Sequence, residues 1–155
     1  MSHKALDVAK ALLHYTEEYN RPITNLHLQK LLYYAQGFSY AMTGYELFAD
    51  DMYAWKYGPA VPRVYEYYHS YVAYPITPEK IDIEQFDSYD TVIIREVARR
   101  IGGMDPWKLA KRVCQEPPWR KNCPMYWSYS PCDNIIPKED IQGYFCKAVT
   151  DWRKS

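Results

Sequence analysis

The feature that most constrains this chain is a series of apolar stripes at helical spacing, interrupted by proline and glycine. Apolar side chains that recur every three or four positions line one face of a helix, which then packs on a core. Proline at a first helical position and glycine just after a last one mark the ends of such helices. The pattern predicts six helices, at residues 5–19, 25–43, 62–74, 91–101, 106–115 and 137–152.

Only a small amount of β structure is expected. Residues 52–56 are short and aromatic, which favours a strand, with residues 46–48 as its candidate partner. An acidic loop, 75–87, contains a possible edge strand at Ile81 and Ile83, and residues 119–133 lack any period and should be irregular. The expected fold is mainly α: a compact bundle of about six helices with a small β-hairpin or short strand element, in a single domain over residues 1–155.

Charge and length exclude several classes of protein. Nineteen basic residues balance nineteen acidic ones, so no net field attracts nucleic acid or an anionic membrane. Residues 95–121 carry eight basic side chains near Trp107 and Trp119, but an acidic loop precedes them, so a nucleic-acid partner is not expected. No apolar run reaches the ~18 residues of a membrane span, and the N-terminus lacks a signal-peptide core. We expect a soluble, cytoplasmic protein without a membrane partner.

Aromatic residues are in excess. Seventeen Tyr, five Trp and four Phe are more than a helical core of this size can hide, so some rings should reach the surface. Tyr and Trp are enriched at protein interfaces because they offer a large apolar face at a small cost in side-chain entropy. A tyrosine-rich core with hydroxyls directed to solvent is the alternative.

The sequence offers no recognisable catalytic or metal-binding pattern. The local signatures of common hydrolases, metalloproteases and nucleotide-binding proteins are missing, and the four histidines lie on different elements. Four cysteines in the last third form no C-x-x-C pair, so they are expected to be free thiols, and we expect no cofactor, no metal and no enzymatic activity. A cysteine-dependent enzyme or a zinc protein remains the rival from another class.

Two longer motifs resemble those of a known family. They read ITNLHLQKLLYYAQG at residues 23–37 and AWKYGPAVPRVY at residues 54–65, and both are similar to the Panacea domain of SocA-like antitoxins, which also occurs in phage- and mobile-element-associated proteins. Residues 109–119 and 136–145 resemble later parts of that family. The resemblance implies a largely helical fold without catalytic activity that neutralises a partner toxin by direct binding. One branch of the family acts instead as an adaptor that delivers its toxin to a bacterial protease.

The motifs also suggest where a partner binds. Along the predicted strand the aromatic side chains alternate with a lysine, a sharp Gly-Pro turn follows, and polar residues of the second helix could reach this turn. The candidate partner-binding residues are Gln29, Lys30, Tyr33, Tyr34, Trp55, Lys56, Tyr57, Gly58, Pro59, Glu116 and, as aromatic anchor, Trp119.

Two alternatives stay open at this stage. The same residues could form a buried structural network, in which Gln29 bonds the turn backbone and Glu116 pairs with Lys56. The partner could also be a host protein that is not a toxin, bound by a phage or mobile-element factor.

Overall fold

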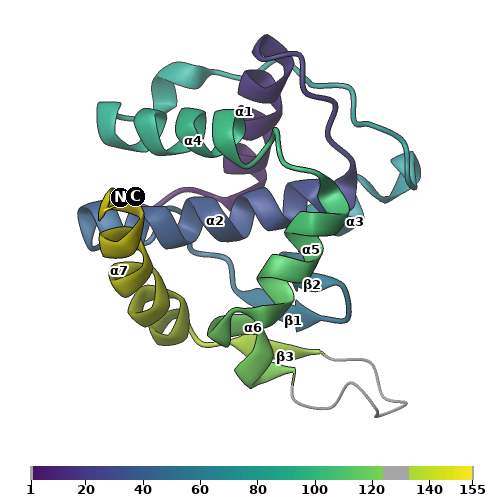
Figure 1. The fold of residues 1–155 in the computed structure, drawn as a ribbon. Helices are drawn as coiled ribbons and strands as arrows, with labels where there is room; N and C mark the ends of the chain where they lie inside the picture. The colour runs from purple at the N-terminus through teal and green to yellow at the C-terminus, as the bar shows by residue number, and fades with distance from the viewer. Residues whose placement is uncertain (1, 124–132, 155) are drawn as a thin grey trace.

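The computed structural model describes residues 2–123 and 133–154, with side chains up to residue 148 in the last helix. The described residues confirm the mainly α class, with seven helices and three short strands (Figure 1). The α-helices are α1 (Ala5–Glu18), α2 (Asn25–Thr43), α3 (Pro62–Tyr67), α4 (Ser88–Arg100), α5 (Pro106–Gln115), α6 (Pro117–Asn122) and α7 (Lys138–Lys154). The strands are β1 (Met52–Trp55), β2 (Gly58–Ala60) and β3 (Asn134–Ile136), and the short 3-10 turns are η1 (His69–Tyr71) and η2 (Ile83–Gln85).

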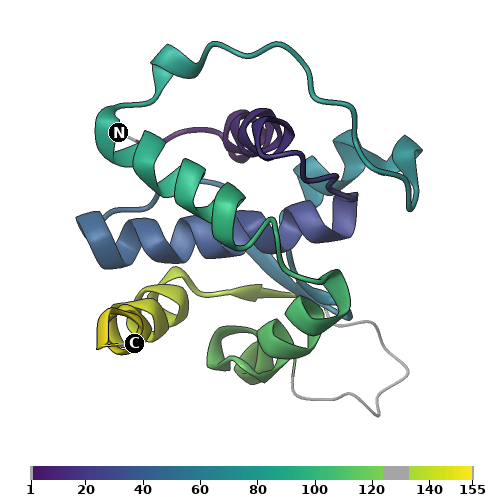
Figure 2. The same ribbon diagram turned by 45° about the horizontal axis from the view of Figure 1, so that its top comes forward.

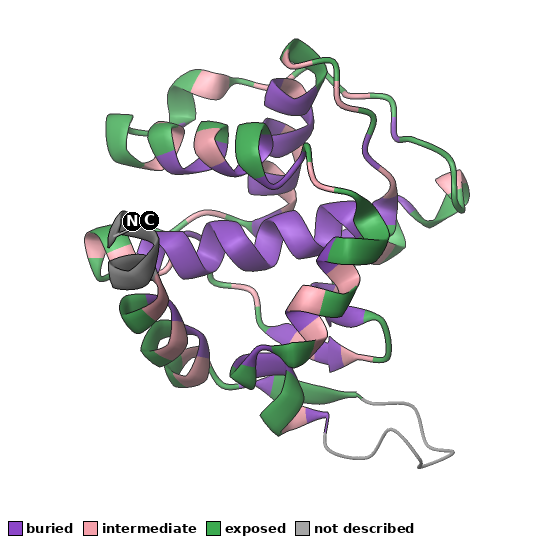
Figure 3. Ribbon diagram, viewed as in Figure 1, coloured by how far each residue is buried: buried purple, intermediate pink, exposed green. Residues whose placement is uncertain are grey.

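Helix α2 runs through the middle of the fold. It lies between α1 and α4 on one side and α7 with the small sheet on the other (Figures 1 and 2). Every residue of α2 from His27 to Tyr40 is buried, as its colour in Figure 3 shows. The sequence predicts its ends well, because the Thr24 hydroxyl accepts a hydrogen bond from the His27 backbone N–H and Gly44 closes the helix at φ +81°.

The sheet differs from the expectation. Strand β1 pairs antiparallel with β2 on one side and β3 on the other, so the predicted pairing with residues 46–48 is wrong. Instead, the backbone of Leu47 and Phe48 is bound by the side chain of Gln36, with N–H to Oε1 distances of 2.8 and 3.1 Å. The edge strand expected at Ile81 and Ile83 is also absent from the described residues, where η2 begins at Ile83.

Three helix boundaries also depart from the prediction. Helix α3 ends at Tyr67 instead of near residue 74, and α4 begins at Ser88 because the side chain of Asp87, not of Asp90, caps it. Residues 119–122, expected to be irregular, belong to α6, whose first helical positions hold the two prolines Pro117 and Pro118. The remainder of the predicted irregular segment, residues 124–132, lies outside the described residues.

The sequence predicted the state of the cysteines only in part, and it predicted that some aromatic rings are exposed. Cys114 and Cys146 form no disulfide, but Cys123 is disulfide-bonded, so the expectation of four thiols is wrong for Cys123. Cys132 lies outside the described residues. Some rings do reach the surface, as expected: Tyr45 and Trp107 are 77% and 81% exposed. No described helix combines the length and the apolar character that crossing a bilayer requires.

Candidate functional site

A small cleft opens where α2 meets the β1–β2 turn. It is lined by Leu26, Gln29 and Lys30 of α2, by turn residues 55 and 57–60, and by Tyr65 of α3, and it encloses about 130 Å³. We call it the Lys30 cleft. The packing of β2 on α2 brings together six of the predicted site residues along this one opening: Gln29, Lys30, Trp55, Tyr57, Gly58 and Pro59.

Gln29 joins the three elements of the cleft. Its Oε1 accepts a hydrogen bond from the Val61 N–H at 2.9 Å, directly after β2, and its Nε2 donates to Asn25 Oδ1 at 3.0 Å. Asn25 Nδ2 in turn donates to the Tyr65 carbonyl at 2.9 Å. Both polar ends of Gln29 are therefore occupied, and this part of the structural-network alternative agrees with the geometry.

Lys30 is a buried lysine at the floor of the cleft. It is 4% exposed, and its Nζ donates to the Leu26 carbonyl at 3.1 Å. Burial lowers the pKa of its ammonium group because the charged form loses hydration. Gly58 lies over the end of this side chain at φ +125°, a conformation that favours glycine, and a Cβ there would lie 3.5 Å from Lys30 Cε.

The β1–β2 turn forms the exposed rim. Trp55 is half-buried, with its ring edge-on to Tyr65 at 5.4 Å between centroids, and its Nε1 donates to Asp133 Oδ1 at 3.1 Å. Tyr57 is 60% exposed, and the Lys56 ammonium lies 5.4 Å from its ring centroid. The rim therefore presents aromatic faces and one cation to solvent.

Three other predicted residues lie in a separate cluster, buried below α7. Tyr33 and Tyr34 are fully buried, and the Tyr34 hydroxyl donates to Glu116 Oε2 at 2.9 Å. Arg112 Nε lies 3.7 Å from the same oxygen, so the expected pair between Glu116 and Lys56 is wrong. Glu116 pairs with Arg112 because the two residues are four positions apart, which places both charges on the same side of α5 and its C-terminal cap. The Lys56 ammonium lies instead over the Tyr57 ring.

The buried cluster is electrostatically unusual. Among the described residues, the Tyr33 hydroxyl and Glu116 Oε1 have no hydrogen-bond partner of normal geometry. Burial raises the pKa of the Glu116 carboxyl, and it raises the pKa of Tyr144, on α7, to about 12. Tyr33 and Glu116 lie inside the protein, Tyr144 is partly buried, and none of the three lines the Lys30 cleft, so they can support the position of α7 but do not belong to this candidate site.

Trp119 lies against the back of β1. It is 9% exposed, and its Nε1 donates to the Trp55 carbonyl at 2.7 Å. Its ring therefore holds α6 against β1 and is not accessible as a surface anchor in this structure.

Three cleft residues were not predicted, namely Leu26, Ala60 and Tyr65. Leu26 lies at the rim and is 47% exposed, and Tyr65 forms the wall under Trp55. Leu26 could have been found, since it is an apolar residue of the motif at 23–37 that lies outside the core stripe of α2. Tyr65 could not, because only the folded hairpin brings it to Trp55.

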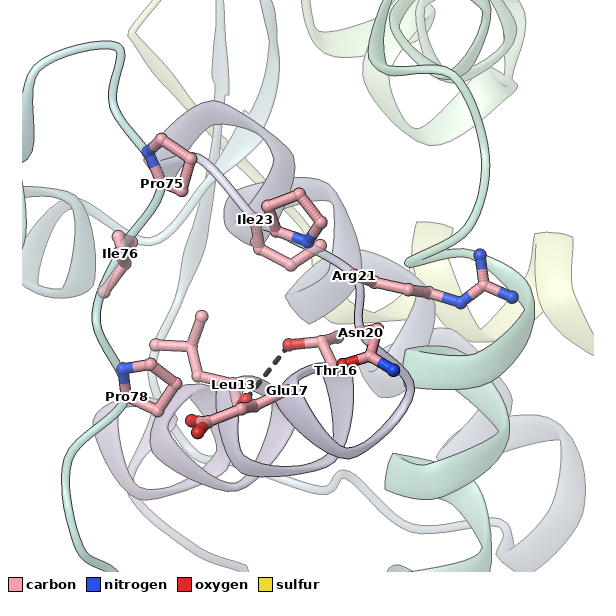
Figure 4. Close-up of a pocket in the computed structure, with 10 residues that line it drawn as sticks. Leu13, Thr16, Glu17, Asn20, Arg21, Ile23, Pro75, Ile76 and Pro78 are labelled. Carbon is pink, nitrogen blue, oxygen red and sulfur yellow. Dashed lines mark hydrogen bonds between the residues drawn. The ribbon is translucent and has the colours of Figure 1, made fainter.

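A larger cavity of about 300 Å³ lies between the end of α1 and residues 75–78 (Figure 4). Its walls are mostly aliphatic, and the Thr16 hydroxyl donates to the Leu13 carbonyl at 3.1 Å. The Arg21 side chain points away from the cavity, toward Gly103 (Figure 4). No group of three or more potential metal ligands was found among the described residues. The Lys30 cleft is therefore the better candidate site.

Comparisons with known proteins point to one family. The family model "Antitoxin SocA-like, Panacea domain" matches residues 28–120, more than half of the chain and nearly all of the Lys30 cleft. Antitoxin SocA of Caulobacter vibrioides (strain NA1000 / CB15N) is 45% identical over 58 residues, which cover 37% of this chain but only 31% of that protein. No solved structure matches. Because the family model covers most of the fold described above, the chain belongs to the SocA-like antitoxin family with a Panacea domain.

Proposed function

We propose that this chain is an antitoxin-type protein that neutralises a partner toxin by binding it directly through the Lys30 cleft and its rim. Membership of the family supports an antitoxin-type role. The proposed site is supported by the cleft itself, which has aromatic and aliphatic walls around the buried ammonium group of Lys30. Pockets that combine an apolar wall with one placed charge are typical of binding hot spots.

The surface around the cleft is large enough to receive a polypeptide. Leu26 and Tyr65 also line an adjoining hollow of about 550 Å³ that extends to Val72. Tyr57 and Val72 are 60% and 75% exposed, so apolar side chains continue on both sides of Leu26. Glu66 and His69 also line the hollow, so exposed apolar side chains lie here beside polar ones, as they do in the core and rim of protein interfaces.

The backbone at Val72 supports the same proposal. Its φ of +55° is rare for a β-branched residue, and such conformations cost about 1–3 kcal/mol. Strain of this kind persists mainly where the fold uses it, and here it holds an isopropyl group in solvent beside the hollow.

The proposed mechanism is binding without catalysis. The rival enzymatic hypothesis requires a reactive cysteine, for which the sequence singles out none, and among the described residues Cys114 lies on α5 near Lys30. Burial raises the pKa of this thiol, which lowers the fraction of reactive thiolate at neutral pH. The cluster around Glu116 is buried as well, so neither group offers an open reaction centre.

Co-expression tests this proposal. The chain is produced together with the product of the gene next to its own, and growth and co-purification are measured. We expect the neighbour to arrest growth alone and the chain to restore growth. Tyr57→Ala at the cleft should weaken co-purification at least ~10-fold, whereas Tyr45→Ala, at a tyrosine that is more exposed but lies beyond the far end of α2, should leave it within ~2-fold.

The same assay distinguishes the alternatives. If Tyr57→Ala and Tyr45→Ala weaken co-purification of the partner equally, or if neither weakens it, the proposed site is rejected. A neighbour that is harmless when expressed alone would favour a host protein as partner. A toxin half-life that shortens when the chain is present, and only in cells with an active ATP-dependent protease, would indicate delivery for degradation instead of blocking.

A further inference from the structure

We propose that the Lys30 cleft receives an acidic side chain of the partner polypeptide, whose carboxylate pairs with the Lys30 ammonium while neighbouring apolar side chains pack on Leu26 and Tyr57. This inference rests on the proposed function and specifies the chemistry of the partner segment at that site.

The first observation is the unbalanced charge of Lys30. A lysine ammonium has three N–H donors, but Lys30 uses one, toward the Leu26 carbonyl at 3.1 Å, and no carboxylate of the described residues lies within ion-pair distance. Two less buried lysines have ion-pair partners: the Lys10 ammonium lies 3.3 Å from the Glu79 carboxylate, and the Lys138 ammonium lies 3.1 Å from the Glu46 carboxylate. A buried charge without a partner is rare because its lost hydration is not replaced.

The second observation is that the amide of Gln29 and the indole N–H of Trp55, two other polar groups of the cleft, are already bonded. Gln29 bonds Val61 and Asn25, and the Trp55 ring N–H bonds Asp133. None of the described residues that line the cleft is acidic; the Asp133 carboxylate at its edge is bound to the Trp55 ring N–H, and Lys56 adds a second positive charge at the rim. The cleft is therefore complementary to a single negative group, and Lys30 is the donor that would bind it.

The size and the walls of the cleft select the kind of anion. A cavity of about 130 Å³ with mainly apolar walls suits a carboxylate on a short aliphatic stem. Phosphate groups are usually held by several donors, such as a forked guanidinium or a row of backbone N–H groups. Lys30 supplies one ammonium group beside the Gly58 backbone, which fits an Asp or Glu side chain better.

This assignment implies a conflict between stability and binding at Lys30. In the free protein the buried ammonium is destabilising, so Lys30→Met, which retains the length of the stem and removes the charge, should raise the melting temperature by about 2 °C or more. The same variant should weaken partner binding about 10-fold or more, because the charge-assisted hydrogen bond is lost. A lysine with a purely structural role would lower the melting temperature when replaced.

Short peptides test the inference without the toxin. Acetyl-Leu-Glu-Leu-amide is titrated into the ¹⁵N-labelled chain, and the amide signals of Lys30 and Gly58 and the indole signal of Trp55 are followed. We expect saturable shifts that the isosteric peptide with Gln in place of Glu reproduces at least ~10-fold more weakly, and that Lys30→Met abolishes.

Each other outcome overturns the inference. Equal shifts from the Glu and Gln peptides would show that the carboxylate is not recognised. Shifts only from acetyl-Leu-Gln-Leu with a free C-terminal carboxylate would assign the cleft to a chain end. A lower melting temperature for Lys30→Met would make the lysine structural. Partner binding that is lost in Tyr57→Ala but unchanged in Lys30→Met would reject this inference while leaving the proposed function intact.

Discussion

Replacing Gly37 with alanine tests how closely α2 and α7 pack. Gly37 lies in the middle of α2, and a Cβ built there would be 2.2, 2.3 and 2.4 Å from three ring carbons of Phe145. Carbon atoms in contact are normally about 3.5–4.0 Å apart, so the ring would have to move by roughly 1.3 Å. Phe145 is 1% exposed and packs edge-on against Tyr33 and Tyr34, so its ring cannot move alone.

Two opposing effects determine the sign of the change. Alanine is a better helix former than glycine by about 1 kcal/mol, which alone would stabilise α2. Overpacking of a filled core costs about 1–3 kcal/mol, and more when a ring must shift with its helix. We therefore expect Gly37→Ala to lower the free energy of unfolding by about 1–2 kcal/mol, which for a chain of this size lowers the melting temperature by about 2–4 °C per kcal/mol.

Urea titration followed by circular dichroism measures this change, and α7 supplies a matched control. Gly143 is also helical, but a Cβ there would meet no atom within 4 Å, so Gly143→Ala should be stabilising by about 0.5–1 kcal/mol. In a Phe145→Ala background, where the ring is gone, Gly37→Ala should also become stabilising. A Gly37→Ala protein that is more stable than the natural one, or that is equally destabilised with and without Phe145, would refute the reasoning.

Three further substitutions probe buried polar groups. Gln36→Ala should destabilise the protein by about 2–4 kcal/mol in urea titrations, because it leaves buried backbone groups of residues 47–48 without partners. Burial raises the pKa of Glu116, so the folded protein binds this proton more tightly than the unfolded chain, and stability falls as pH rises through the folded-state pKa. Glu116→Gln should remove the part of this loss of stability that is due to Glu116. Free energies of unfolding measured from about pH 4 to pH 8 test this. Trp119→Phe should cost about 1–3 kcal/mol, seen as a lower urea midpoint, since the Trp55 carbonyl loses its donor.

Local patterns predicted much of the helical fold. The stripe of α1, the Thr24 cap and Gly44 end of α2, and the Asp105-Pro106 start of α5 all follow from side chains within a few residues of each boundary. Such end signals depend on hydrogen bonds between residues close in the sequence and on the fixed φ of proline. They therefore act in the same way wherever the segment lies in the fold. The predicted ends failed at α4, where Asp87 and not Asp90 caps the helix, and at α3, which ends at Tyr67.

The candidate site was predicted in composition but not in arrangement. Gln29, Lys30 and the Trp55–Pro59 turn do share one cleft, but Tyr33 and Tyr34, only a helical turn away, lie under α7. Helix α2 is covered on all sides, so it has no face that is left to solvent. The spacing of its apolar residues predicts one buried face but cannot show that α7 covers the opposite face as well. Trp119 was expected at the surface because residues 119–133 have no period, whereas α6 carries it inward.

By itself, the sequence determined the helical class, most helix ends and the family motifs, because these depend on neighbours along the chain. Only the tertiary structure decided that β3 joins β1 from about 80 residues away, that Glu116 meets Tyr34 and not Lys56, and that Lys30 lies buried without a counterion in the described part of the chain. These features depend on which distant surfaces meet, and no local pattern encodes that pairing. The burial of Lys30, which underlies the proposed partner chemistry, therefore became visible only when α2 and the β1–β2 turn were seen together.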